Sequence, residues 1–229
     1  MYNRLVERFG PQRWWPAKTA FEVVIGAFLT QNTAWTSVER SIVNLEARGI
    51  LNVAGLRAVS EDELRALIRP SGFMLRKAAA LKGFIVFLDA HYGGSMKRLR
   101  AAAQRSPASV RVELLALPGV GPETADAILL YALDAPAMVV DEYLRRIVVR
   151  HGLLPGNPKY AAIQALAEQA FVPKPGRPPE TAATLARHYN EFHALVVEIG
   201  KRHCRRVAHC EDCPLAFDLP RSQLPKSPA

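Results

Sequence analysis

Apolar residues recur at helical spacing along most of the chain. Phe21, Val24, Ile25 and Phe28 fall three and four residues apart, as on one face of a buried helix. Two β-branched runs, 139–140 and 147–149, are too short to indicate a sheet, and we interpret them as the end of a loop and part of a helix. We therefore predict an all-α fold. The same apolar pattern predicts further helices over approximately 2–13, 35–45, 60–68, 77–90 and 181–203.

Polar and proline-containing breaks separate these helices. Ser60 with Glu63 three residues later forms a capping box, which predicts a helix start. Residues 30–33 form a polar break, and residues 173–179 form a basic, proline-rich loop that cannot continue a helix. The polar tail after Pro220 is expected to be disordered.

Composition and charge narrow the class of partner. The chain has 229 residues, about half of them apolar, which is enough for one good core or two small ones. Lys and Arg outnumber Asp and Glu by 30 to 21, and the pI is near 9.8, which favours nucleic acid over a membrane as partner. The sequence has no apolar run long enough to span a membrane, and we expect no signal peptide, because Arg4 and Arg8 interrupt the N-terminal segment. We expect a cytoplasmic, nucleoid-associated monomer.

A glycine-rich hairpin lies between two amphipathic runs. Its sequence is Leu117-Pro-Gly-Val-Gly-Pro122, in which the glycines permit a tight turn and close approach of a ligand. Pro122 suits the first position of the second helix, and Glu123 and Asp126 add acid to its opening turn. The N–H groups at such a helix start favour a phosphate. Further along the chain, Asp141 ends the apolar run Val139-Val140.

Together these motifs resemble the helix-hairpin-helix DNA glycosylases of the endonuclease III superfamily, whose signature is Leu-Pro-Gly-Val-Gly, a helix and Val-Asp. The plainer interpretation is an ordinary helix–helix connection with a helix-capping aspartate. The resemblance implies two helical domains flanking a DNA-binding cleft. One is a six-helix barrel with the hairpin (19–135); the other joins 1–18 to 136–220 and carries a cysteine-rich loop, and 221–229 is a tail.

The resemblance also implies a reaction. A glycosylase rotates a damaged nucleotide out of the duplex and breaks the bond between base and sugar. The position of Asp141 after the hairpin matches the superfamily's catalytic aspartate, which stabilises the cationic sugar and activates water. Bifunctional members have a lysine where this chain has Glu123, and a carboxylate cannot form an imine. We therefore expect a monofunctional enzyme with weak or absent lyase activity. The plainer interpretation of Glu123 is an acid in the first turn of a helix, without a chemical role. Lys201 is the lysine that could supply a lyase amine instead.

We expect tryptophan side chains to form part of the pocket that binds the flipped base. All three lie at predicted helix ends, and core packing is the alternative explanation for any one of them. Flat aromatic rings favour a cationic, methylated purine. Several segments resemble the 3-methyladenine glycosylase branch, in which two aromatics sandwich the base and a lysine lines the pocket: Trp14-Trp15-Pro16, 30–33 with Trp35, 69–73, 123–129, 192–193 and Lys201. A cationic base would be repelled by that lysine unless its charge is neutralised.

Other residues are predicted to contact DNA. By resemblance, Gln31 fills the space left by the flipped base, although a solvent-exposed loop amide is an equal alternative. Gly119, Val120 and Gly121 are expected to bind a phosphate through the backbone, and the hairpin carbonyls to hold a monovalent cation. Arg145 is expected to contact the DNA backbone, which positions the duplex without reading its sequence.

The three cysteines form one cluster, Cys204-x5-Cys210-x2-Cys213, which resembles the iron–sulfur loop of many superfamily members. Their usual spacing is six, two and five, so the first gap is one residue short and Leu219 replaces the fourth cysteine. Asp218 is the candidate fourth ligand of a [4Fe–4S] cluster. A zinc site using His203 or His209, or an empty loop, are the alternatives.

Three functions therefore compete. The first is a monofunctional glycosylase that removes an alkylated purine such as 3-methyladenine from double-stranded DNA. The second is an endonuclease III paralogue with weak activity on oxidised or mispaired pyrimidines. The third is a non-catalytic DNA-binding module of the same fold, against which the presence of Asp141 argues.

Overall fold

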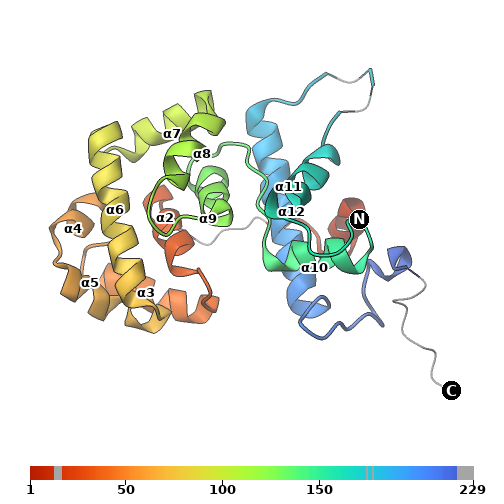
Figure 1. Ribbon diagram of the computed structural model, residues 1–229, viewed down its shortest axis with the longest axis horizontal. Helices are drawn as coiled ribbons and strands as arrows, with labels where there is room; N and C mark the ends of the chain where they lie inside the picture. Colours follow the sequence, from red (N-terminus) through yellow and green to blue (C-terminus); the bar gives the residue numbers. More distant parts are fainter. Residues whose placement is uncertain (13–16, 174, 177, 221–229) are drawn as a thin grey trace. The chain divides into compact units, whose positions relative to one another are not determined.

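The computed structural model describes residues 1–12, 17–173, 175–176 and 178–220, and every regular element in these ranges is a helix (Figure 1). The all-α prediction is confirmed. The chain divides into two compact units, residues 15–137 and residues 1–14 with 138–229. We call them the hairpin unit and the C-terminal unit, and each is described by itself.

The hairpin unit is built around helix α2, of which Phe21 and residues 23–29 are buried. This helix packs against α3, α6, α9 and η2, because an element that is apolar on all sides must be covered on all sides. The helices of this unit are α2 (Ala20–Leu29), α3 (Trp35–Ala47), α4 (Val53–Ala58), α5 (Glu61–Leu67), η1 (Arg69–Ser71), α6 (Met74–Tyr92), α7 (Met96–Arg105), α8 (Pro107–Leu115), α9 (Pro122–Ala127) and η2 (Ile128–Ala132).

The C-terminal unit is built around the long helix α12, which packs against α1 and α10. An aromatic cluster of Tyr2, Phe171, Tyr189 and Phe192 joins α1 and the segment after α11 to this helix. The helices are α1 (Tyr2–Phe9), α10 (Glu142–Arg150), α11 (Tyr160–Gln169), α12 (Ala182–Arg202) and η3 (Ala216–Asp218).

Several helix ends follow the sequence signals. Ser60 accepts a hydrogen bond from the Glu63 backbone at 3.2 Å and caps α5, and Pro122 is the first residue of α9, so both predicted helix starts are confirmed. The Glu63 carboxylate, which a capping box would direct to the Ser60 N–H, instead accepts from Arg48 Nε at 2.6 Å. The first helix ends at Phe9 rather than residue 13, because Gly10 has a φ of 67°. The predicted tail lies outside the described residues.

Three α-helices, the short 3₁₀ helices η1 and η3, and one irregularity were not predicted. Helix α7 has few apolar residues, α11 is rich in alanine and α4 contains a glycine, so none of them has a strong apolar period. The second hairpin helix changes to a π-helix at Ile128–Ala132, where all five residues are buried. Such turns occur often at functional sites.

Candidate active site and nucleic-acid interface

The hairpin exposes its glycine backbone. Gly119 and Gly121 are exposed, whereas Val120 between them is buried and donates its N–H to Leu117 O at 3.1 Å. Gly119 has a φ of 80°, which favours glycine. Its backbone also approaches α6, since a Cβ there would lie 3.6 Å from the Ala80 Cβ. The chain is therefore folded so that the backbone at the turn faces outward.

An ion pair with a buried carboxylate joins the two helices of the hairpin. Arg111 on α8 donates to both carboxylate oxygens of Asp126 on α9, at 2.6 and 2.9 Å. Asp126 has no exposed side-chain surface. The sequence interpretation of Asp126 as an acid of the opening turn was therefore incomplete, because this carboxylate clamps the hairpin from inside.

Gln31 contacts the hairpin. Its amide nitrogen donates to Gly119 O and to Thr124 Oγ1, both at 2.9 Å. The side chain thus links the polar break after α2 to both sides of the turn. Sequence reasoning did not identify this contact, because the partners are 88 and 93 residues away.

A buried lysine stabilises the polar break. Lys77 on α6 is 3% exposed. Its ammonium donates to Leu29 O and Thr33 Oγ1 at 2.7 Å and to Ser71 O at 2.8 Å, which satisfies its three donors. Burial lowers the pKa of Lys77 to about 8, so it stays protonated at neutral pH. In the sequence, the only indication of this role is that Lys77 falls among the apolar positions of α6.

Phe73 is an exposed aromatic ring on a strained backbone. It precedes α6 with a φ of 48°, and 60% of the residue is exposed. Bulky residues seldom adopt this conformation, and such strain clusters at functional sites. Its combination of exposure and strain could not be read from the sequence.

The tryptophans are only partly described. Trp14 and Trp15 lie outside the described residues. Trp35 is the first residue of α3 and half-buried, and its Nε1 donates to Glu39 Oε1 at 2.7 Å.

Asp141 caps helix α10. Its Oδ1 accepts the Leu144 N–H at 2.8 Å, which is the N-cap geometry that aspartate favours. The side chain is 12% exposed, and its Oδ2 lies 3.6 Å from Nε2 of His193 on α12. The buried Val139 and Val140 precede it. The carboxylate is therefore held in a fixed place at the start of a helix.

Glu123 and Lys201 are both exposed. Glu123 lies in the first turn of α9. Lys201 lies in the last turn of α12. It follows His193 by eight residues in the sequence, a rise of about 12 Å along a helix. The structure thus places Lys201 at a different level of α12 from the contact with Asp141.

Arginines form a groove along α10. Arg145, Arg146 and Arg150 line a groove of about 290 Å³ with Glu142, Val149 and Arg206. Hydrogen bonds from Arg145 and then Arg146 lower the pKa of Glu142 to about 2, although burial opposes them. The excess of guanidinium groups makes this groove suited to phosphate.

The three cysteines line one small cavity with Ile147, Ile199 and Leu215. Arg150 donates to the Cys204 sulfur at 3.1 Å and to Arg206 O at 2.8 Å, and Arg146 donates to Cys204 O at 3.0 Å. Burial raises the pKa of the Cys204 thiol, and the hydrogen bond from Arg150 opposes that shift. The loop is therefore attached to α10 through two arginines.

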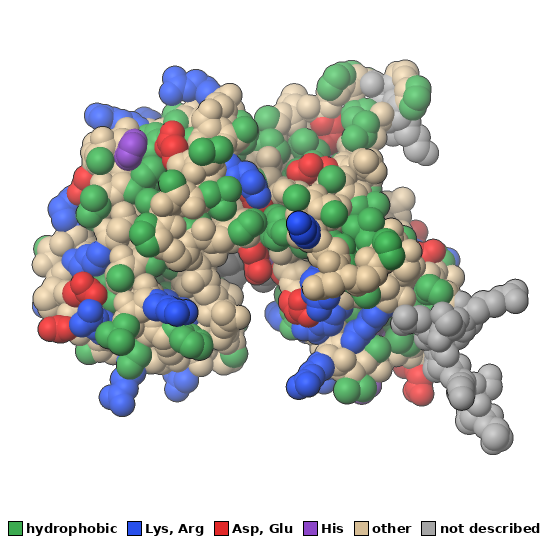
Figure 2. Space-filling model, in the orientation of Figure 1, with side chains coloured by type: hydrophobic (Ala, Val, Ile, Leu, Met, Phe, Trp, Pro, Cys, Tyr) green, Lys and Arg blue, Asp and Glu red, His purple; other side chains and the backbone are tan. Residues whose placement is uncertain are grey.

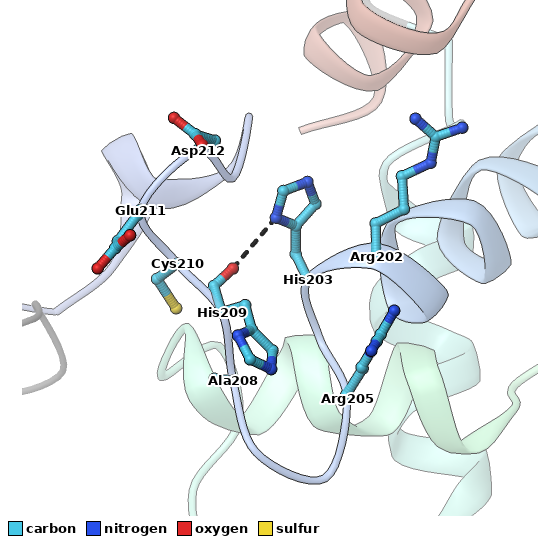
Figure 3. A pocket seen from close by; sticks show the side chains of 8 residues that line it. All are labelled: Arg202, His203, Arg205, Ala208, His209, Cys210, Glu211 and Asp212. Carbon is cyan, nitrogen blue, oxygen red and sulfur yellow. Dashed lines mark hydrogen bonds between the residues drawn. The ribbon is translucent and has the colours of Figure 1, made fainter.

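A second hollow, of about 650 Å³, lies on the outer side of this loop. Figure 3 shows Arg202 and Arg205 on one side and Glu211 and Asp212 on the other. His203 Nδ1 lies 3.1 Å from the backbone oxygen of His209.

Asp218, the candidate fourth ligand of the cluster, lies outside the cavity that the three cysteines line. Leu219 lines the cavity and Asp218 does not; the Asp218 carboxylate lies 3.8 Å from His151 Nδ1. Among the described residues, no three His, Cys, Asp or Glu side chains are placed to hold a single metal ion. Thiolates on one zinc ion must converge on a point, whereas those on an iron–sulfur cluster bind different irons. Three cysteine sulfurs that line one cavity are a donor set of the kind that an iron–sulfur cluster uses.

Positive charge is distributed over the surface. The chain has a net charge of +9, and Figure 2 shows Lys and Arg side chains in blue on the visible face of both units. In the part of the chain that the structure describes, no helix has the length and apolar character to cross a membrane.

Comparison with known proteins identifies the family of the chain. Residues 25–173 match the HhH-GPD superfamily base excision DNA repair protein family. A putative DNA repair glycosylase of Methanocaldococcus jannaschii is 42% identical over 94% of this chain and 92% of that protein. Helicobacter pylori 3-methyladenine DNA glycosylase bound to 1,N6-ethenoadenine superposes with a TM-score of 0.69 at 28% identity, covering 86% and 92% of the two chains.

A trapped endonuclease III–DNA covalent intermediate has a TM-score of 0.75 at 20% identity, covering 95% of this chain and 92% of that chain, and it shows the shared fold. The predicted endonuclease III type of fold is thereby confirmed. With its hairpin, its helical architecture and these matches, the chain belongs to the HhH-GPD superfamily of base excision DNA repair proteins.

Proposed function

We propose that this protein is a monofunctional DNA glycosylase that removes an alkylated purine, such as 3-methyladenine, from double-stranded DNA as a monomer. The observation that carries the proposal is Asp141, a largely buried carboxylate fixed as the N-cap of α10. Family membership supports the reaction class, and the likeness to a 3-methyladenine glycosylase supports the substrate class.

In this mechanism the flipped nucleotide presents its sugar to Asp141. The bonding electrons leave with the base, and positive charge develops on the sugar. The carboxylate stabilises that charge and accepts a proton from the water that attacks C1′. The products are a free base and an abasic site in an intact strand.

Glu123 supports the monofunctional assignment. It occupies the position at which the resemblance places the lyase lysine, and it has no amine for an imine. Borohydride should therefore trap no covalent adduct between the wild-type protein and DNA containing the excised site. The Glu123→Lys variant is the matched control, because it restores an amine at the same helix position. An adduct with the wild type would contradict the assignment.

The groups proposed to bind DNA differ in their tasks. The exposed backbone of Gly119 and Gly121 contacts a phosphate, whereas the N–H of the predicted Val120 is already bonded to Leu117 O. The hairpin carbonyls hold a monovalent cation, and Arg145 contacts a neighbouring phosphate. Phe73 has the exposed aromatic ring of a wedge that enters the base stack. Trp35 is the described candidate for stacking on the base, Lys201 is a candidate for the pocket, and Gln31 is a candidate for filling the vacated space.

We also propose that Cys204, Cys210 and Cys213 hold three corners of a [4Fe–4S] cluster, with Asp218 as candidate ligand of the fourth iron. When bound, the cluster would supply structure only, because it would fix the basic loop after α12. Iron content and visible absorbance of protein purified without oxygen test this, and Cys213→Ser should reduce both. Stoichiometric zinc or a metal-free loop would contradict the cluster.

The central experiment measures base release by wild type and Asp141→Asn. The variant should release 3-methyladenine about 10²- to 10⁴-fold more slowly from duplex DNA treated with dimethyl sulfate. Asparagine caps a helix as well as aspartate, so thermal unfolding should change little. An unchanged rate would exclude this mechanism. Release of thymine glycol alone would favour the endonuclease III paralogue, and binding without release of any base would favour the non-catalytic module.

A further inference from the structure

His193 is a polar residue on the buried face of α12. It is 6% exposed, and the same helix buries Tyr189, Val196 and Val197. A polar ring in such surroundings costs free energy unless its nitrogens have partners. Its Nε2 atom faces the Asp141 carboxylate of α10 at 3.6 Å. The ring therefore points at the side chain to which we assign the chemistry.

Helix α10 fixes one of the two carboxylate oxygens of Asp141 by a hydrogen bond. The Leu144 N–H donates to Oδ1 at 2.8 Å. One hydrogen bond fixes one oxygen and leaves the plane of the carboxylate able to pivot about it. His193 faces the other oxygen, Oδ2, so a donor at this place would fix the plane.

A glycine sets the distance between the two helices. A Cβ on Gly200 would lie 2.2 Å from Cδ1 of Tyr143, so glycine is required where α12 meets α10. Gly200 follows His193 by seven residues, two helical turns along the same face. Tyr143 follows Asp141 by two residues. The Gly200–Tyr143 contact therefore helps to set the spacing across which His193 meets Asp141.

We infer that His193 is a positioning residue for Asp141, whose Nε2–H donates to Oδ2 and orients the carboxylate toward the reacting sugar. This rests on the proposed function, because it takes Asp141 as the reacting group. The separation of 3.6 Å is longer than a hydrogen bond, and such contacts often shorten once substrate is bound. A neutral ring is sufficient, since it fixes the oxygen without cancelling the negative charge that stabilises the sugar cation.

Three substitutions separate positioning from packing. His193→Gln places an amide N–H near the position of Nε2, His193→Asn places one near Nδ1, and His193→Leu has no donor. We measure release of 3-methyladenine in single-turnover assays on duplex DNA treated with dimethyl sulfate. At saturating protein, the Leu and Asn variants should be about 10- to 100-fold slower. This is the loss typical when a residue that orients a metal-binding side chain is replaced, and we expect a similar loss for a residue that orients a catalytic carboxylate. The half-saturating protein concentration should stay unchanged, and Gln should restore most of the rate. Thermal unfolding of all three provides the stability control.

A double-mutant cycle shows whether His193 acts through Asp141. In the Asp141→Asn background, His193→Leu should cause no further loss. If Asp141→Asn alone keeps the wild-type rate, the proposed function fails and the inference with it. If Asp141→Asn is slow but His193→Leu keeps the wild-type rate, or lowers the rate equally in both backgrounds, only the inference is overturned.

A spectroscopic measurement needs no substrate. The ¹⁵N chemical shifts of the His193 ring should show the proton on Nε2 in the wild type, because a hydrogen-bond partner selects the tautomer. In Asp141→Asn these shifts should change. A neutral ring protonated on Nδ1 alone would overturn the inference.

Discussion

The hairpin unit and the C-terminal unit present their candidate groups in different ways. In the hairpin unit they are mainly backbone atoms of the exposed Gly119 and Gly121. In the C-terminal unit they are side chains, above all Asp141 and the arginines of α10. A backbone group is positioned by the local path of the chain, whereas a side chain also needs a neighbour to fix its rotamer.

The supporting contacts differ accordingly. The hairpin is clamped by Arg111 and Asp126, which are 15 residues apart on successive helices. In the C-terminal unit, Arg150 contacts Cys204 across 54 residues. The first kind of support forms with the motif itself, and the second forms only when distant helices pack. Four changes test this difference.

The largest expected effect is the loss of the hairpin clamp. Asp126→Ala leaves the partly exposed Arg111 guanidinium without its buried partner and should lower the free energy of unfolding by about 2–3 kcal/mol, the range of hydrogen bonds to charged groups. Denaturant unfolding measures this. Asp62→Ala is the control, because its side chain is 91% exposed and pairs with Arg65 at the surface, and it should change little. Equal effects of the two variants would contradict the clamp.

Next in size is the attachment of the cysteine loop. Arg150→Met removes the hydrogen bonds to Cys204 and Arg206 and should destabilise the loop by about 1–2 kcal/mol. A protease should then cleave the loop after α12 faster, as measured by mass spectrometry of the released peptides. Arg145→Met, which loses only the surface pair with Glu142, should leave that rate unchanged. An unaltered rate in Arg150→Met would show that other contacts hold the loop.

A smaller effect, of opposite sign, is expected at Phe73. Asparagine tolerates the left-handed conformation, so Phe73→Asn should raise the free energy of unfolding by about 1 kcal/mol. The same change should weaken binding to duplex DNA, because the exposed ring is lost. Leu75→Asn is the matched control, as Leu75 is 63% exposed and lies inside α6; it should not stabilise the protein. A less stable Phe73→Asn variant would show that the ring packs.

The smallest effect concerns Glu142. Hydrogen bonds from Arg145 and Arg146 lower its pKa to about 2 from 4.5, so these pairs stabilise the folded state above pH 4.5 and are lost as the pH falls toward 2. Glu142→Gln should therefore melt slightly below the wild type at pH 7 in low salt, and the difference should vanish near pH 2. Because the side chain is 53% exposed, high salt should also remove most of it. A difference independent of pH would exclude this origin.

Local motifs predicted much of the hairpin unit. The glycines and Pro122 specify the turn and the start of α9 because these residues fix backbone conformation directly. Ser60 specified the start of α5 in the same way. Asp141 was predicted as the catalytic residue from its position after the hairpin and Val139-Val140. Its hydrogen bond to the Leu144 N–H as a helix cap is a local contact.

Contacts between distant helices could not be predicted. His193 was noted only as part of a motif, because nothing in its own segment indicates that it faces Asp141. The contacts of Lys77 and Gln31 were unpredictable in the same sense, since their partners come from segments far away in the sequence. Asp126 was misinterpreted because a helix-opening acid and a buried clamp look alike in sequence.

The narrow contact at Gly200 has a genetic consequence. Alanine there would add one methyl group against Tyr143 and push α10 outward, carrying its N-terminal aspartate with it. On the proposed function, a screen for cells sensitive to alkylating agents should therefore recover substitutions at Gly200 as repair-deficient alleles, although this residue has no side chain with which to touch a lesion.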